Sequence, residues 1–150
     1  MPERDNSFEV VHFSRAPRQV VFDVLADYAG YKKFTKLTIS EVEVPGDPAP
    51  NGVGAVRRLG APGYSVREKI LAYDPPNSMS YTIVAGVPVE GYRADVTLED
   101  SVSGGTRITW VGHFDSARYG LAPVLRSGFK FVVGDLARAA AREAERRTSA

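Results

Sequence analysis

The sequence predicts an α+β fold in which a curved antiparallel sheet of seven strands is wrapped around one long C-terminal helix. Segments that alternate apolar and polar residues follow one another through the middle of the chain, joined by short turns rich in glycine and proline. Strands in such a series pair antiparallel. A short helical pattern precedes the series and a longer one follows it. The longer helix needs the inner face of the sheet to cover its apolar stripe.

The N-terminal part of the chain is expected to form one strand and two short helices. Residues 8–14, FEVVHFS, are rich in strand-favouring residues. Pro17 then suits the first turn of a helix, because that position needs no N–H donor. The helix at 18–28 has apolar residues at the spacing of a buried stripe, and Gly30 interrupts it. A second short helix is expected in 31–37.

The rest of the chain is expected to form the sheet and the long helix. Six further strands are predicted at 37–44, 53–59, 64–73, 78–85, 90–100 and 105–115. From Tyr119 the apolar period becomes helical again. The stripe of this helix consists of Leu121, Leu125, Phe129, Val132, Leu136 and Ala140. With no repeat and no break in composition, residues 1–150 are expected to be a single domain.

The composition is that of an ordinary water-soluble domain, with 43% hydrophobic and 25% charged residues. The 19 Lys and Arg residues oppose 18 Asp and Glu residues, so no global field attracts nucleic acid or anionic lipid, although local basic patches are compatible with these numbers. The lack of cysteine excludes disulfides and thiolate chemistry. We find no signal peptide or membrane-spanning segment, and expect a cytoplasmic protein without integral membrane association or a nucleic-acid partner. The oligomeric state is not determined.

Three separated segments carry a family resemblance: APRQVVFDVLADYAGY, YDPPNSMSYTI and EGYRADVTLEDSVSGGTRITWVGHF. In this order and spacing they resemble the polyketide cyclase/dehydrase and lipid-transport group of the SRPBCC superfamily, also called START-like or Bet v 1-like. The resemblance implies a helix-grip fold, with a hydrophobic tunnel between the sheet and the C-terminal helix. Members include lipid carriers, hormone receptors and aromatase/cyclases and share no catalytic motif, so the fold alone does not give the function.

Two turns are similar to the mobile loops that flank the tunnel mouth in plant hormone receptors of this superfamily. They are LGAPG at 59–63 and GVPVEG at 86–91. Glycine and proline in a tight connection are also what any hairpin uses, so plain turns are the alternative interpretation. The resemblance predicts that these two turns frame the entrance of the tunnel.

Alternation along the last strand predicts which side chains face the helix. One face carries Ile108, Trp110, Gly112 and Phe114. Because this face is apolar, Trp110 is predicted to point inward and His113 outward. Gly112 would then leave space in the interior, where another residue would place a side chain.

The same rule turns Tyr81, Tyr92 and Glu68 inward on the neighbouring strands. Burying a carboxylate without a partner costs several kcal/mol or raises its pKa. Glu68 therefore needs a hydroxyl or cationic partner, or a place near the mouth in water. The predicted ligand-binding residues are Glu68, Tyr81, Tyr92, Trp110, Phe114, Leu125, Phe129, Val132 and Leu136. Such walls suit a flat, mostly apolar molecule, although the same residues would also fill an ordinary core.

Metal and cofactor chemistry has little support in the sequence. A metal site needs about three convergent ligands, and the chain has only two histidines, His12 and His113. No phosphate-binding loop, dinucleotide fingerprint or serine elbow occurs, so we assign no cofactor and no catalytic residue. Arg57 and Arg58 are interpreted as solvated surface residues.

We therefore expect the chain to bind a hydrophobic small molecule, either a lipid or an aromatic or polyketide-like compound, as a carrier or sensor. The alternative is a polyketide cyclase or aromatase-dehydratase that uses the same pocket, with Tyr81, Tyr92 and Glu68 moving protons. His12 joins these groups if it points inward. A third hypothesis is a structural or interaction module whose own side chains fill the cavity.

Overall fold

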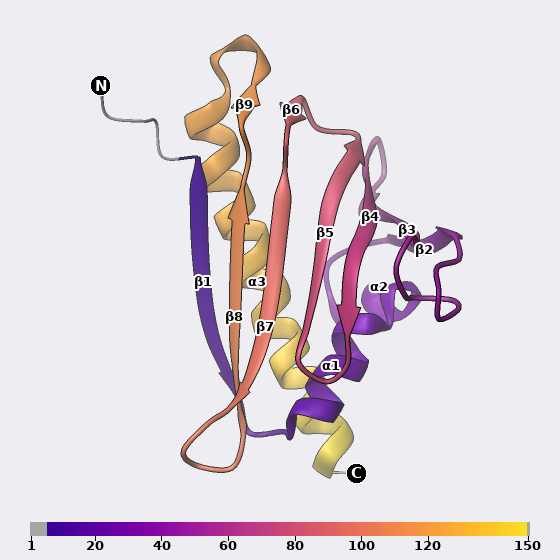
Figure 1. Cartoon of the computed structure of the whole chain (residues 1–150), viewed down its shortest axis with the longest axis vertical. Helices are drawn as coiled ribbons and strands as arrows, with labels where there is room; N and C mark the ends of the chain where they lie inside the picture. Colours follow the sequence, from indigo (N-terminus) through magenta and orange to yellow (C-terminus); the bar gives the residue numbers. More distant parts are fainter. Residues whose placement is uncertain (1–5, 150) are drawn as a thin grey trace.

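Seven strands form one antiparallel sheet in the computed structural model, which describes residues 6–149 (Figure 1). They are β1 (Ser7–Ser14), β2 (Ile39–Val44), β3 (Val56–Ala61), β4 (Tyr64–Asp74), β5 (Ser78–Ala85), β7 (Arg93–Asp100) and β8 (Thr106–His113). Their order across the sheet is β1-β8-β7-β5-β4-β3-β2, so β1 and β2 are its two edges. This architecture, completed by a long C-terminal helix, confirms the predicted fold class.

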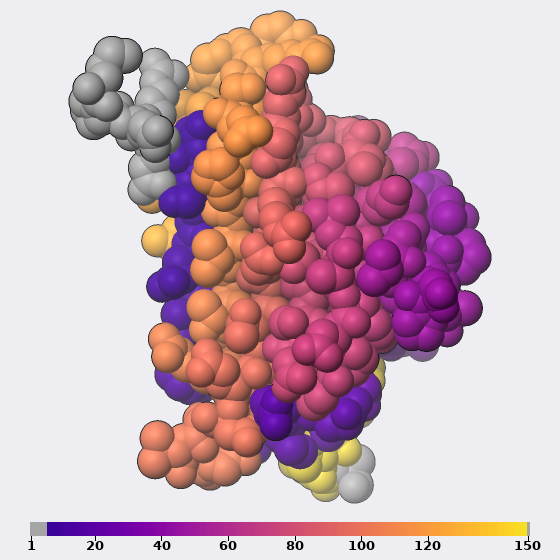
Figure 2. Space-filling model, in the orientation of Figure 1, coloured from indigo at the N-terminus to yellow at the C-terminus, as the bar shows by residue number. Residues whose placement is uncertain are grey.

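The helices cover one side of the sheet. The long helix α3 (Ala122–Ser149) lies behind the strands in the view of Figure 1. The connection from β1 to β2 contains α1 (Arg18–Ala26), the 3₁₀ turn η1 (Tyr28–Gly30) and α2 (Tyr31–Phe34), and both α1 and α2 contact α3. Figure 2 shows from the same direction that the outer face of the sheet hides most of α3. Within the described residues, no helix combines the length and hydropathy that crossing a membrane requires.

The strand predicted at 90–100 is shorter than expected, because its first residues leave the sheet. Gly91 has a φ of 68°, in the left-handed region that interrupts an extended strand. The residues before it form β6 (Val89–Glu90), which pairs with β9 (Ser116–Ala117) in a separate two-stranded sheet. The turn at 86–91 is therefore braced against the chain that leads into α3.

The long helix begins later than its periodicity predicts. Tyr119 and Gly120 have φ values of 60° and 68°, and such left-handed residues cannot belong to a right-handed helix. They lie in the short 3₁₀ turn η2 (Arg118–Gly120), after which α3 starts at Ala122. The irregular residues thus lie before the first turn of the helix.

The side chains of β8 alternate as predicted. Trp110 is 1% exposed, whereas the side chain of His113 is 58% exposed. Both ladders of β8 run in register, without a bulge near Gly112. The expectation that Gly112 leaves space is wrong, because a β-carbon there would lie 2.2 Å from Cζ of Phe8. The Phe8 ring from the edge strand β1 occupies that volume.

The buried face of α3 differs from the predicted stripe. Its buried residues are Ala122, Val133, Ala137, Ala140, Ala141, Glu143 and Ala144. Val132, which was expected to face the sheet, is 58% exposed. Alanine side chains let the helix approach its neighbours closely, so the contact face follows small residues rather than the largest apolar ones. Leu125, Phe129 and Leu136 are only partly buried.

Candidate functional site

A cavity of about 390 Å³ lies between α3 and the strands β3, β4 and β5. This volume is within the range of roughly 300–1,000 Å³ that is common for small-molecule sites. Its apolar wall includes Leu59, Val66, Ile83, Leu125, Phe129 and Leu136. The helix therefore contributes its partly buried large residues to the cavity, and its alanines pack elsewhere.

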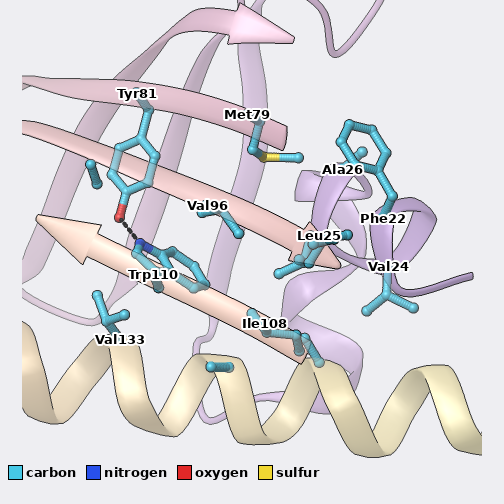
Figure 3. Packing of buried hydrophobic residues seen from close by; sticks show 14 of the residues in the cluster. Phe22, Val24, Leu25, Ala26, Met79, Tyr81, Val96, Ile108, Trp110 and Val133 are labelled. Carbon is cyan, nitrogen blue, oxygen red and sulfur yellow. Dashed lines mark hydrogen bonds between the residues drawn. The ribbon is translucent and has the colours of Figure 1, made fainter. Parts of the chain in front are cut away.

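Seven of the nine predicted ligand-binding residues border this cavity: Glu68, Tyr81, Tyr92, Leu125, Phe129, Val132 and Leu136. Trp110 and Phe114 do not border it and are buried beside it. The indole N–H of Trp110 donates a hydrogen bond of 3.2 Å to the Tyr81 hydroxyl, and Val133 of α3 lies on its other side (Figure 3). Phe114 meets Phe129 edge to face, with 5.8 Å between ring centroids. These two aromatics support the wall from behind.

Side chains from three parts of the chain surround the mouth of the cavity. Tyr64, at the start of β4, is 58% exposed, and Phe131 of α3 is 74% exposed. Val87, from the turn at 86–91, also borders the cavity. That turn touches β4 closely, since a β-carbon on Gly86 would lie 2.3 Å from the carbonyl oxygen of Ser65. Both turns that were predicted to frame the entrance therefore lie at the cavity.

The polar end of the cavity is a buried ion pair. The Nη2 and Nε atoms of Arg57 lie 2.8 and 2.9 Å from Oε1 of Glu68. Burial raises the pKa of the Glu68 carboxyl above its usual range, and Arg57 opposes that shift. Burial alone would lower the pKa of Arg57, but attraction to Glu68 outweighs it and raises the pKa. Of the alternatives predicted for Glu68, a hydroxyl partner, a cationic partner or a place in water near the mouth, the structure shows the cationic partner.

Three tyrosine rings surround the guanidinium of Arg57. Its Cζ atom lies 4.6 Å from the ring centroid of Tyr81 and 4.8 Å from that of Tyr28. Tyr31 is slightly farther, at 5.8 Å, and its hydroxyl accepts a hydrogen bond of 3.3 Å from Nη1. Aromatic faces attract a desolvated cation. They therefore help to offset the cost of burying Arg57.

Two phenols stand beside this ion pair at the cavity. Burial raises the pKa of Tyr81 and that of Tyr92 well above the ordinary phenol value. Both hydroxyls are protonated at neutral pH and hydrogen bond to each other, so one of the two protons is already engaged within the pair. The polar end thus offers one free neutral donor together with a carboxylate whose charge is already balanced.

The interpretation of Arg57 as a solvated surface residue is wrong, because this side chain is 1% exposed. A signal for it exists in the sequence. Alternation along β3 places Arg57 on the same face as Ala55 and Leu59, and both neighbours are buried. It also lies opposite Glu68 in the ladder between β3 and β4. Arg58 points the other way and pairs with Glu41 at 3.3 Å.

The two histidines are not brought together. His12 pairs with Ile108 in the β1–β8 ladder, whereas His113 pairs with Ser7 at the other end. The Nδ1 atom of His12 is buried and has no hydrogen-bond partner in the described part of the chain. His12 does not border the cavity. Residues 6–149 contain no cluster of three or more His, Cys, Asp or Glu side chains that could hold a metal ion.

Residues 6–147 match the protein family described as polyketide cyclase / dehydrase and lipid transport. The chain belongs to this family. A comparison with curated proteins found no match. Membership in the polyketide cyclase/dehydrase and lipid-transport family confirms the resemblance seen in the sequence. It agrees with an apolar cavity beneath the C-terminal helix, and it does not specify a ligand.

Solved structures with the same fold extend over nearly the whole chain. Ara h 8.0201 is 24% identical, with a TM-score of 0.71, and the match covers 92% of this chain and 96% of that one. Protein XoxI from Bacillus cereus is 14% identical, with a TM-score of 0.69 and coverages of 91% and 94%. A protein from Nitrosospira multiformis is 18% identical, with a TM-score of 0.66 and coverages of 88% and 94%. At these identities the similarity establishes the Bet v 1-like fold.

Proposed function

We propose that this protein is a cytoplasmic carrier or sensor that binds a small, mostly apolar molecule in the cavity beneath α3. The observation that carries the proposal is the cavity of about 390 Å³, which aliphatic and aromatic side chains wall on most sides. The hypothesis of a structural or interaction module, in which the chain's own side chains fill this space, does not account for a cavity of this volume. Apolar walls with a few placed polar groups are the usual chemistry of a small-molecule site.

The proposed ligand lies with its apolar part against Phe129, Leu125 and Leu136. Any polar group it carries points to the opposite end, where Tyr92 donates a hydrogen bond and Glu68 is held by Arg57. Trp110 and Phe114 act indirectly in this proposal, by supporting Tyr81 and Phe129. An apolar molecule with one hydrogen-bond acceptor fits this arrangement better than a strongly anionic one, since Arg57 is already neutralised by Glu68.

Filling the cavity tests the proposal. Val66 and Leu71 lie on the same strand, but Val66 borders the cavity whereas Leu71 faces outward and is 37% exposed. We expect Val66→Trp to weaken binding of the neutral fluorescent probe Nile red at least tenfold, and Leu71→Trp to leave it unchanged. Native mass spectrometry of freshly purified protein should show a bound small molecule, and Val66→Trp should remove it.

Equal Nile red binding by both variants would contradict the proposal, because the probe would then bind outside the cavity. Far-ultraviolet circular dichroism of each variant shows whether it is folded. The bound class is separated by competition: a saturated fatty acid and an anthraquinone are titrated against the probe. The more effective competitor indicates a lipid or a flat aromatic ligand.

A second candidate function is that of a polyketide cyclase or aromatase-dehydratase. The observation that favours it is that Tyr81, Tyr92 and Glu68 gather at one end of the cavity. Protonated phenols at that end can polarise a ketone. We expect Tyr92→Phe to slow cyclisation of a linear poly-β-ketone at least tenfold and to weaken binding of that chain by a smaller factor. A wild-type protein that binds the chain and leaves it uncyclised would remove this candidate.

A further inference from the structure

The N-terminal half of α3 exposes large apolar side chains to solvent. Val124, Phe131 and Val132 are 67%, 74% and 58% exposed. Val124 and Phe131 are seven residues apart, two helical turns, so they lie on the same face of the helix. Tyr64, 58% exposed, stands on the other side of the cavity mouth from α3. Monomeric proteins seldom expose such a group of apolar side chains without a partner.

Two segments at this surface have only basic charges, and the nearest acidic residue along α3 is Asp135, which borders the cavity. Residues 28–40 and 116–134 together contain six of the 19 basic residues of the chain and none of its 18 acidic residues. The six are Lys32, Lys33, Lys36, Arg118, Arg126 and Lys130. The two segments are neighbours in space, since α2 contacts α3 and both segments border the cavity. The remainder of the chain has an excess of acidic residues.

The lysines on this side differ from the charges on the outer face of the sheet. Several of those charges pair with carboxylates, as Arg67 does with Glu43 at 2.6 Å and Arg93 with Asp95 at 3.2 Å. Lys69 and Arg107 on that face form no ion pair within residues 6–149. On the side of α2 and α3, all of Lys32, Lys33, Lys36 and Lys130 are exposed and form no ion pair with any residue in 6–149. These cations are free to meet external negative charge.

We infer that this surface, formed by α2 and the N-terminal half of α3, docks onto the face of a lipid bilayer that contains anionic lipids. Phe131 and Val124 enter the boundary between headgroups and acyl chains, and the lysines contact the headgroups. Exposed apolar residues flanked by lysine are what an interfacial helix uses to lie on a membrane without spanning it. The inference goes beyond ligand binding, since the surface exists whatever the cavity holds.

A bilayer fits better than a protein partner for two physical reasons. Three of the exposed apolar side chains follow one helix and the fourth, Tyr64, stands across the cavity mouth, and a fluid interface accepts them without a matching groove. The lysines lack acidic neighbours in both segments, and an anionic bilayer supplies negative charge without fixed positions. The cavity mouth opens at this surface, so an apolar molecule could pass between bilayer and cavity without crossing water.

Vesicle sedimentation tests the inference. The full chain is mixed with vesicles of phosphatidylcholine alone, or of phosphatidylcholine with phosphatidylglycerol. We expect it to sediment with the anionic vesicles only and to be released by high salt, which screens the lysines. Phe131→Ser and the triple variant Lys32→Gln/Lys33→Gln/Lys130→Gln should each weaken this binding at least tenfold.

Matched controls come from the outer face of the sheet. Phe13 is 60% exposed on β1, so Phe13→Ser removes an equally accessible aromatic ring. The triple variant Lys69→Gln/Arg93→Gln/Arg107→Gln removes the same number of exposed positive charges from that face. Both controls should bind anionic vesicles within twofold of the wild type.

Two results would overturn the inference: wild-type protein that stays in the supernatant with anionic vesicles, or controls that lose as much binding as the test variants. Nile red binding measured without vesicles distinguishes failure of the membrane-docking surface from failure of the proposed ligand site. Lys32, Lys33 and Lys130 do not border the cavity, so their triple variant should bind the probe normally. If the triple variant loses vesicle binding and still binds the probe normally, the membrane-docking surface is supported. If the wild type binds the probe but no vesicles, the docking surface is rejected and the proposed ligand site stands.

Discussion

The N-terminal half of α3, residues 122–136, and its C-terminal half, residues 137–149, meet the rest of the protein in different ways. The C-terminal half buries a row of small residues: Ala137, Ala140, Ala141 and Ala144. Its backbone is tied to the end of β1, where the Ser14 hydroxyl donates a 2.9 Å hydrogen bond to the carbonyl oxygen of Ala141. The N-terminal half instead presents leucine, phenylalanine and valine, borders the cavity and exposes Phe131.

This difference indicates how one helix both closes a core and leaves a binding space. Where the helix face is alanine, neighbouring backbones come close enough to leave no volume between them. Where it carries Leu125, Phe129 and Leu136, the helix surface stands farther from the strands, and the side chains do not fill the gap to β3 and β4. We call residues 137–149 the closed half of α3 and residues 122–136 its open half. The closed half stabilises the fold, and the open half forms one wall of the candidate site.

The largest effect is expected beneath the open half, from Arg57→Met. This change leaves the Glu68 carboxylate buried without its partner, and breaking a buried pair costs about 3–5 kcal/mol. Urea denaturation followed by Trp110 fluorescence measures the free energy of unfolding. Arg58→Met is the matched control, because Arg58 and Glu41 are partly exposed and their pair is worth at most about 1 kcal/mol.

A cost of Arg57→Met no greater than that of Arg58→Met would contradict the assignment of a buried pair. Replacing both partners, as in Arg57→Met with Glu68→Leu, should recover most of the loss. The reason is that an apolar pair of similar volume leaves no uncompensated charge.

The next effect is expected in the closed half, from Ala137→Leu. Ala137 is fully inaccessible, so three added carbon atoms have no room, and such overpacking costs about 1–3 kcal/mol. Ser127→Leu places the same side chain on the exposed surface of the open half and should change the free energy of unfolding by about 0.5 kcal/mol or less. Thermal unfolding of both variants measures the difference. Similar melting temperatures would show that the closed half is not tightly packed.

A pH dependence is expected at the end of the closed half. Hydrogen bonds from Arg146, and next from Arg147, lower the pKa of Glu143 from 4.5 to about 2. Because the folded pKa is the lower one, the stabilisation is complete above about pH 4.5 and is lost as the pH falls toward 2. Arg146 is 70% exposed, so solvent screening limits this contribution to about 1 kcal/mol.

Glu143→Gln should therefore lower the free energy of unfolding at neutral pH and have a diminishing effect as the pH falls from 4.5 to 2. Urea denaturation of wild type and variant at several pH values in this window gives the difference curve. A difference that stays constant across the window would assign the effect of the variant to packing instead of charge.

The smallest effect is expected from Gly128→Ala in the open half. An added β-carbon at Gly128 or at Gly134 meets no atom within 4 Å, so alanine at either position should stabilise the helix by up to about 1 kcal/mol. Only Gly128 borders the cavity. Gly128→Ala should therefore weaken Nile red binding severalfold in a fluorescence titration, whereas Gly134→Ala should not. Equal Nile red binding by the two variants would show that probe binding does not depend on the space beside Gly128.

Local periodicity in the sequence was sufficient to predict the strands, the order of elements and the inward direction of Trp110, Tyr81 and Tyr92. These are consequences of backbone geometry, since alternate side chains of a strand point to opposite faces whatever surrounds them. The same alternation would have placed Arg57 inward beside Leu59. The prediction failed there because a residue type that is usually solvated was given more weight than its position.

Tertiary structure alone decided which inward side chains meet the cavity and which close the core. Trp110 and Tyr92 face the same side of the sheet, yet only Tyr92 borders the cavity. Likewise, the space over Gly112 is occupied by Phe8, which lies more than a hundred residues away in sequence. The physical reason is that a cavity is the volume left between elements distant in the chain. Its position depends on how closely a helix approaches a sheet, which no local pattern encodes.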